Sequence, residues 1–185
     1  MKKLGILASH NGSGFSAIYK AILEEKLNIQ ITLVISNNTN ATVLQNAKKH
    51  NLNNFLVNSK TDENPDEKIY TLLKEHKCEY IFLSGYMKKL SSKVINEFKV
   101  LNSHPSLLPK YGGSGMYGRF VHEAVIKNAE KESGVTIHEV SEEYDEGKIL
   151  LQKKLTLSQD ESVESLEIKI KQLEASSIVE VLQNV

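Results

Sequence analysis

Asn102 and His104 are the residues whose types and spacing most directly suggest chemistry. They lie at the carboxyl end of a predicted strand. Alternation along an extended chain points both side chains the same way, and Pro105 favours that conformation at His104. An amide donor beside an imidazole suits the stabilisation of a developing oxyanion, and the imidazole can also carry a proton. We interpret the pair as a candidate catalytic site, with a purely structural histidine as the alternative.

Asp145 is the carboxylate that could complete such a site. It belongs to the turn Tyr144-Asp145-Glu146-Gly147 between two predicted late strands. A carboxylate close to His104 would raise the pKa of the imidazole and keep it charged, which is the second half of an acid/base pair. A turn of this composition also forms in hairpins for conformational reasons alone.

The segment Ser9–Ala17 is a glycine-containing turn between the first predicted strand and the first predicted helix. Gly12, Ser13 and Gly14 would present backbone amides at a helix N-terminus to an anion. The spacing fits G-x-G-x-x-A, but Ser36–Asn40 lacks the acidic residue that a dinucleotide site needs after the second strand. The turn therefore favours a single phosphomonoester, and a turn without a ligand is the alternative.

A fourth candidate segment follows the strand predicted over residues 80–83. Met87, Lys88, Lys89 and Leu90 could line a slot for a flat heterocycle, although a plain strand-to-helix loop explains the same residues. The remaining histidines are weaker candidates: His10, His50, His76, His122 and His138. Because no pair of them has metal-ligand spacing with an adjacent acid, the sequence predicts no metal site.

Short apolar runs, which predict strands, alternate along the chain with stretches of helical periodicity, which predict helices. These elements must position the candidate residues. This pattern predicts one α/β domain over residues 1–185, Rossmann-like, with a mostly parallel twisted sheet flanked by helices and an antiparallel C-terminal portion. The predicted strands cover residues 4–8, 29–35, 54–57, 80–83, 100–103, 135–140 and 149–157. The predicted helices cover residues 15–25, 41–50, 66–76, 91–98 and 121–128, with a last helix from Val163 to beyond Val181. The irregular segment Pro105–Arg119 is expected to be a functional loop.

Composition excludes several classes of partner. The 185 residues are 40% hydrophobic and 25% charged, as in a soluble globular protein, and 23 basic side chains balance 23 acidic ones. A neutral chain has no long-range field toward nucleic acid or a membrane. The single cysteine, Cys78, fits a reducing compartment, and no segment has the pattern of a signal peptide or a membrane span. We expect a cytoplasmic protein, monomeric or homodimeric, that acts on small molecules.

Together these motifs resemble the folate-dependent formyltransferases, and within them the phosphoribosylglycinamide formyltransferases. The most specific piece is the run from Asn102 to Pro109, Asn-Ser-His-Pro-Ser-Leu-Leu-Pro. The glycine turn, the segment from Gly85 to Leu90, and Gly134–His138 followed by Asp145 extend the likeness over nearly the whole chain. Two positions depart from the common pattern, Ser103 in place of Ile and Gly14 in place of Asn.

The resemblance implies a function: transfer of the formyl group of 10-formyltetrahydrofolate to the amine of glycinamide ribonucleotide, in de novo purine biosynthesis, without a metal. It implies that Asn102 and His104 stabilise a tetrahedral intermediate and that Asp145 tunes His104. The implied substrate-binding residues are Gly12, Ser13, Gly14 and Glu174, and the implied folate contacts are Met87, Lys88, Lys89, Leu90 and Asn102. Two alternatives stay open, a formyltransferase for another amine acceptor and a non-catalytic phosphate- or nucleotide-binding module. The length leaves room for one formyl-transfer domain and little else.

Overall fold

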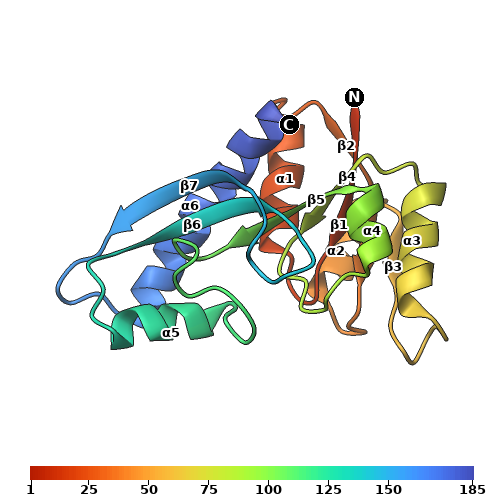
Figure 1. The fold of residues 1–185 in the computed structure, drawn as a ribbon. Coiled ribbons are helices and arrows are strands. Elements are labelled where there is room, and N and C mark those ends of the chain that lie inside the picture. The colour runs from red at the N-terminus through yellow and green to blue at the C-terminus, as the bar shows by residue number, and fades with distance from the viewer. The chain divides into compact units, whose positions relative to one another are not determined.

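The computed structural model describes all 185 residues, which divide into two compact units, Met1–Leu101 and Asn102–Val185. Figure 1 labels the helices and strands of both. The first unit contains β1 (Lys2–Leu7), α1 (Ser13–Leu23), β2 (Ile29–Ser36), α2 (Thr42–Lys49), β3 (Asn54–Leu56), α3 (Pro65–Glu75), β4 (Tyr80–Leu83) and α4 (Ser92–Glu97). Strand β5 (Lys99–His104) begins there and ends in the second unit. The second unit continues with α5 (Arg119–Lys127), β6 (Glu132–Glu139), β7 (Ile149–Thr156) and α6 (Val163–Asn184).

The strands of the first unit pair in parallel. β1 lies between β2 and β4, and β3 pairs with the outer side of β2. Residues 33–35 of β2 are fully buried, and residues 4–7 of β1 are nearly so, as expected for parallel strands covered on both faces. In such a sheet the carboxyl ends of the strands share one edge, so the segments that follow β1, β2 and β4 lie near one another.

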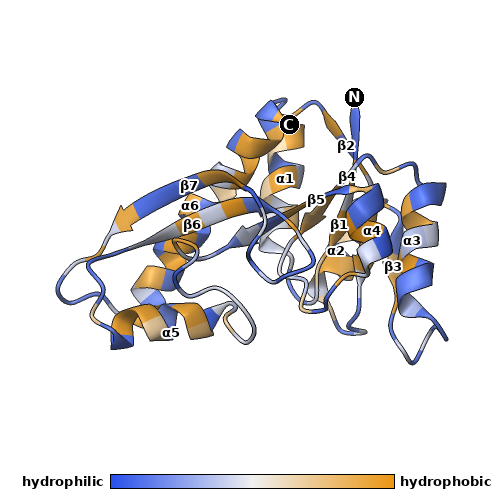
Figure 2. Cartoon of the chain, viewed as in Figure 1, coloured by the Kyte–Doolittle hydropathy of each residue, from blue (hydrophilic) through white to orange (hydrophobic).

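The helices of the first unit follow from capping and amphipathic signals. Helix α3 begins with Pro65, and the side chain of Asn64 accepts a hydrogen bond from the Glu67 amide. It buries Ile69 and its neighbours along one face. Figure 2 shows the corresponding mixture of hydrophobic and hydrophilic residues along this helix.

The second unit is built around an antiparallel hairpin. β6 and β7 pair with Thr136 opposite Gln152, and a register shift lies between Ile137 and His138. Helix α6 packs against both strands and against α5. The side chain of Ser162 caps α6 by accepting from the amide of Ser165.

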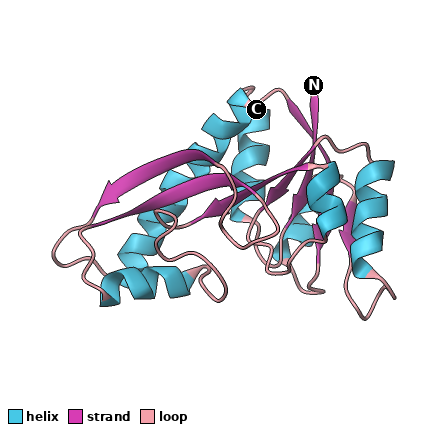
Figure 3. Cartoon of the chain, in the orientation of Figure 1, coloured by secondary structure: helices cyan, strands magenta, loops and turns pink.

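The segment between β5 and α5 has no regular structure (Figure 3). Several of its residues adopt left-handed backbone conformations, among them Tyr111, Gly113, Gly115 and Gly118. This agrees with the loop expected over Pro105–Arg119, except that α5 already begins at Arg119 and not at Val121.

The predicted fold class is confirmed. Seven strands form a mixed, mostly parallel arrangement, with parallel pairs in the first unit and the antiparallel pair β6–β7 in the second. The main boundary error is at β6, which begins at Glu132 and not at Val135. Glycine is a weak strand former, but a Cβ at Gly134 would lie 2.1 Å from the carbonyl oxygen of Lys153, so close strand packing requires glycine there. No helix is both long and apolar enough to cross a membrane.

Candidate active site

His104 and Asp145 lie side by side within the second unit. Nδ1 of His104 is 3.5 Å from Oδ2 of Asp145, and the two side chains are 5% and 12% exposed. Asp145 has a left-handed backbone (φ 58°), which aspartate tolerates better than most residues. The amide of Gly113 donates to the same carboxylate oxygen at 2.9 Å. The turn between β6 and β7 therefore holds the carboxylate of Asp145 next to His104, the last residue of β5.

His138 occupies the other side of the carboxylate. Its Nε2 is 3.4 Å from Oδ1 of Asp145 and 3.2 Å from the side-chain amide nitrogen of Asn102. Nδ1 of the same ring is 2.9 Å from the carbonyl oxygen of Glu139. Nε2 of His138 therefore lies between the Asp145 carboxylate and the Asn102 amide, while Nδ1 faces the Glu139 carbonyl. Asn102, His138, Asp145 and His104 therefore form one contiguous polar chain, which we call the His104 network.

His138 is the residue that sequence reasoning undervalued. It stood among the weaker histidines because it lies in an alternating strand with no partner visible in the sequence. The available signal was its position near the end of the strand that leads into the turn carrying Asp145. Because antiparallel strands keep such residues close to their own hairpin, this placement already favoured contact with that turn.

Asp145 and burial act on the pKa of His104 in opposite directions. Burial lowers the pKa of the His104 imidazole below its ordinary value, and it outweighs the raising effects of Asp145 and of the Tyr111 carbonyl. Nε2 of His104 lies 2.7 Å from that carbonyl oxygen. Both ring nitrogens therefore face oxygen acceptors, Nε2 the Tyr111 carbonyl and Nδ1 the Asp145 carboxylate.

Asp145 itself stays ionised. Burial opposes its charge, but hydrogen bonding from His138, the proximity of His104 and the Gly113 amide together hold the pKa of the carboxyl below its ordinary value. The network therefore contains one anion between two imidazoles. Such an anion favours the charged form of His104 when further negative charge appears nearby.

Glu174, the other predicted residue of this unit, lies on α6 and is half-buried. Burial raises the pKa of its carboxyl. The side chain of Ser103, which lies between Asn102 and His104 in the chain, acts on the pKa of Glu174 in the opposite direction, so Glu174 lies next to the strand end that carries the His104 network.

The predicted phosphate turn has the backbone that its glycines suggest. Gly12 is left-handed (φ 66°) and caps α1, whose first residues are Ser13 and Gly14. A Cβ at Gly12 would lie 2.5 Å from Cγ2 of Val43, so no side chain fits there without a shift. The first amides of a helix have no partner within the helix and carry partial positive charge, which makes this turn suitable for an anion.

The segment Met87–Leu90 lies beside the phosphate turn in the first unit. The amide of Met87 donates to the hydroxyl of Ser9 at 2.8 Å, and the amide of Ser9 donates to the carbonyl of Gly85 at 3.1 Å. Met87, Lys88 and Lys89 are exposed, and Leu90 is buried. Two of the segments singled out in the sequence are thus joined by direct hydrogen bonds.

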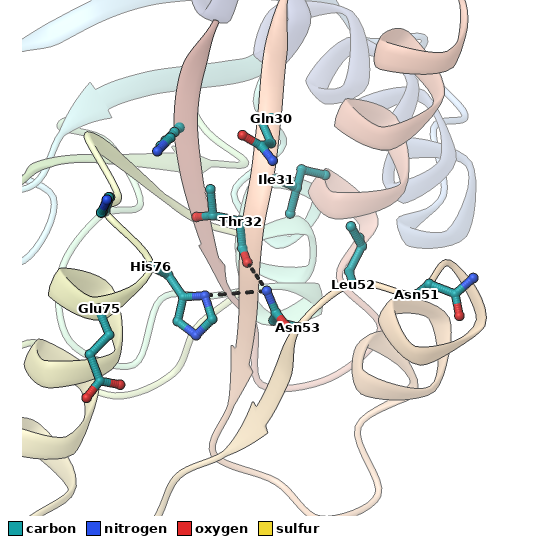
Figure 4. A pocket seen from close by; sticks show the side chains of 10 residues that line it. Gln30, Ile31, Thr32, Asn51, Leu52, Asn53, Glu75 and His76 are labelled. Carbon is teal, nitrogen blue, oxygen red and sulfur yellow. Dashed lines mark hydrogen bonds between the residues drawn. The ribbon is translucent and has the colours of Figure 1, made fainter.

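A cavity of about 380 Å³ in the first unit contains none of the predicted site residues. Figure 4 shows its lining, with Asn53 bonded both to the backbone of Thr32 and to His76. Gln30 and Thr32 lie near the amino end of β2, whereas the predicted segments follow the carboxyl ends of strands. This cavity is therefore not the site predicted from the sequence. No group of three or more metal-ligating side chains that could hold an ion is present either.

Comparison with known proteins assigns the family. A family model described as formyl transferase matches residues 2–182. The chain belongs to the formyl transferase family. This match confirms the resemblance seen in the motifs and includes all of the predicted site residues.

Relatives within the formyl transferase family share one name. Phosphoribosylglycinamide formyltransferase of Bacillus subtilis is 32% identical over 94% of this chain and 89% of its own length. The chloroplastic enzymes of that name from Vigna unguiculata and Arabidopsis thaliana are 34% and 31% identical over 98% of this chain. The chain spans only 60% and 64% of the length of these two plant proteins.

Solved structures agree with the sequence relatives. The crystal structure of phosphoribosylglycinamide formyltransferase from Bacillus halodurans matches with a TM-score of 0.90 and 28% identity, over 99% of this chain and 94% of that one. The protein of the same name from Campylobacter jejuni matches with a TM-score of 0.82 and 31% identity, over 99% and 96%. The chain therefore shares the fold of these formyl transferases over its full length.

Proposed function

We propose that the chain transfers the formyl group of 10-formyltetrahydrofolate to the amine of glycinamide ribonucleotide, a step of de novo purine biosynthesis. The observation that carries the proposal is the His104 network, in which an amide donor, two imidazoles and an ionised carboxylate meet. Membership of the formyl transferase family and the shared name of the relatives supply the reaction class. We further propose that residues 1–185 act as one formyltransferase domain.

The substrates are assigned to the segments that match the family's motifs. The phosphate of glycinamide ribonucleotide binds at Gly12, Ser13 and Gly14, where helix amides attract an anion. Glu174 contacts the rest of this substrate. The folate lies along the segment Met87–Leu90 and against Asn102.

The chemistry of the reacting carbon follows from the donors of the network. The substrate amine attacks the formyl carbon, the C=O bond opens, and a negative oxygen forms on a tetrahedral centre. The side-chain amide of Asn102 and the Nε2–H of His104 donate to this oxygen. In the structure the carbonyl oxygen of Tyr111 lies 2.7 Å from Nε2, which supports the placement of a substrate oxygen at this position. The formyl oxygen takes its place, so the segment around Tyr111 must move when substrate binds.

Proton movement completes the transfer. The attacking nitrogen must lose a proton, and N10 of the folate must gain one as its bond to the formyl carbon breaks. The negative oxygen at Nε2 and Asp145 at Nδ1 then place anions on both sides of the His104 ring, which favours the charged imidazole at this stage. A proton passes from the attacking nitrogen to N10, and the electron pair on the negative oxygen re-forms the C=O bond as the bond from the carbon to N10 breaks. No covalent enzyme intermediate is required.

The two alternatives make different demands on the same residues. A non-catalytic phosphate-binding module has no need for a buried carboxylate between two imidazoles, so the contact of Asp145 with His104 disfavours it. A formyltransferase for another amine would use the same network with a different acceptor. An assay with 10-formyltetrahydrofolate and glycinamide ribonucleotide, run beside other amines, tests the choice. Turnover with another amine and none with glycinamide ribonucleotide would overturn the assigned acceptor.

We place this activity in the cytoplasm with small-molecule partners only. The supporting observations are the balance of 23 basic and 23 acidic side chains and the one cysteine, Cys78, which is a buried free thiol. A neutral surface gives no general attraction for nucleic acid or for an anionic membrane. Whether the active form is a monomer or a homodimer stays a prediction for sedimentation analysis.

A further inference from the structure

Ser9 lies in the loop after β1, is fully buried, and uses all of its polar groups in contacts with two other loops. Its amide donates to the Gly85 carbonyl at 3.1 Å, and its hydroxyl accepts from the Met87 amide at 2.8 Å. The same hydroxyl donates to Oδ1 of Asn37 at 2.6 Å, and the carbonyl of Ser9 accepts from the side chain of Asn38 at 2.6 Å. Ser9 thus joins the loops that follow β1, β2 and β4.

We propose that Ser9 is a positioning residue, which holds the segment Met87–Leu90 in register with the phosphate turn. This inference rests on the proposed function, because it assigns the folate to one segment and the nucleotide phosphate to the other. Only a group that donates and accepts at once can satisfy Met87 and Asn37 together, and a serine hydroxyl does both. An alanine at this position would leave the amide of Met87 and the amide oxygen of Asn37 without these partners.

Asn37 and Asn38, which follow β2, take part in the same set of contacts. Dinucleotide-binding folds carry an acidic residue near this position for ribose hydroxyls. Here the side chains of Asn37 and Asn38 face back to Ser9, and the carbonyl of Asn37 accepts from the side chain of Asn58 at 3.0 Å. These polar groups therefore organise neighbouring loops of the first unit.

Replacement of Ser9 separates a positioning role from simple filling of the core, because the two roles predict different effects on stability and on substrate affinity. If Ser9 only fills space, its replacement lowers the unfolding temperature and leaves the affinity of the remaining folded enzyme unaltered. If Ser9 sets the register of two binding segments, its replacement weakens both substrates together and alters the chemical step little. Loss of such uniform binding raises KM with kcat nearly unchanged.

The test compares Ser9→Ala with Ser158→Ala in the full chain. Ser158 is a suitable control because its exposed hydroxyl donates to the side chain of Glu161, three residues on, at 3.2 Å, outside every segment assigned to a substrate. For Ser9→Ala, which loses the two hydrogen bonds of the hydroxyl, we expect KM for both substrates to rise about tenfold or more, with kcat within about threefold of wild type. Hydrogen exchange at the Met87 amide should accelerate in Ser9→Ala and stay unchanged in Ser158→Ala.

The exchange measurement separates this proposal from the proposed function, since it needs no substrate. If the wild-type protein binds neither glycinamide ribonucleotide nor tetrahydrofolate in calorimetry, the proposed function fails while Met87 exchange still reports on Ser9. If Ser9→Ala does not fold, Asn37→Ala removes the acceptor of the Ser9 hydroxyl at a half-buried position and becomes the deciding variant. Unchanged Met87 exchange and unchanged KM values in the folded variant would overturn the positioning role.

Discussion

Oδ1 of Asp145 faces Nε2 of His138 at 3.4 Å, while its other oxygen faces His104 at 3.5 Å. One carboxylate therefore serves two imidazoles, of which only His104 was singled out in the sequence as catalytic. The arrangement lets His138 hold Asp145 and Asn102 in place while Nδ1 of His104 contacts the same anion. Removing the charge at Asp145 should consequently affect the protonation of His104 as well as its orientation.

Asp145→Asn is the sharpest variant for this carboxylate. Asparagine has nearly the same shape and also tolerates the left-handed backbone of this position, so the change removes charge with little strain. We expect kcat to fall by about 10²- to 10⁴-fold, the usual range for loss of acid/base assistance. Steady-state formyl transfer measures this, with Glu146→Gln as the control because Glu146 is the exposed neighbour in the same turn. Equal activity of the two variants would remove Asp145 from the mechanism.

His104→Ala should abolish measurable formyl transfer. The change removes both a donor to the negative oxygen, which commonly contributes about 10²- to 10³-fold in rate, and an imidazole whose charged form that negative oxygen favours. His104 is 4% exposed, so its truncation also leaves a cavity, and near-ultraviolet circular dichroism should confirm that the fold is retained. His76→Ala, in the cavity of Figure 4, is the control. Near wild-type turnover of folded His104→Ala would contradict the mechanism.

The fold was predictable because its signals are local. The apolar run at residues 29–35 and the helical periodicity at residues 66–76 act within a few residues of chain, and β2 and α3 lie within one residue of those predicted bounds. Contact between Asp145 and His104 depends on tertiary placement and could be proposed only from the family resemblance. The net direction of the His104 pKa was not predictable, because burial, which no sequence pattern measures, outweighs the raising effect of the carboxylate. His138 was undervalued for the same reason, since its partners come from other segments.

Stability should fall as pH decreases through about 6.5, the ordinary pKa of histidine. Burial lowers the pKa of both His104 and His122 in the folded state. The unfolded chain then binds more protons than the folded one, so acid favours unfolding until the pH lies below the folded values. Each such histidine contributes a slope of up to about 1.4 kcal/mol per pH unit.

His122→Leu isolates one of these groups. His122 is 3% exposed on α5, its Nδ1 has no hydrogen-bond partner, and the charges that act on it are those of Glu167, Lys171, Arg119 and His104. Replacement by an apolar side chain of similar size loses no hydrogen bond at Nδ1 and removes the titration. Urea unfolding between pH 7 and pH 5 should show a shallower pH dependence for the variant than for wild type. Parallel curves would show that His122 binds its proton equally in both states.

Gly12→Ala should weaken glycinamide ribonucleotide binding more than folate binding. The new Cβ would meet Cγ2 of Val43 at 2.5 Å, and the left-handed backbone costs a non-glycine residue about 1–2 kcal/mol. Both effects displace the amides at the start of α1, so we expect KM for the nucleotide to rise about tenfold or more, whereas KM for the folate changes less.

Two companion variants separate the causes of that effect. Gly85→Ala carries a similar backbone cost (φ 68°), but its Cβ would meet nothing within 4 Å, so it reports strain without collision. The double variant Gly12→Ala, Val43→Ala removes the collision and keeps the strain. Recovery of nucleotide KM in the double variant would assign the loss to displacement by Val43. If Gly12→Ala raised both KM values equally, the phosphate would not be bound at this turn, because a local displacement of helix amides acts on the anion they hold.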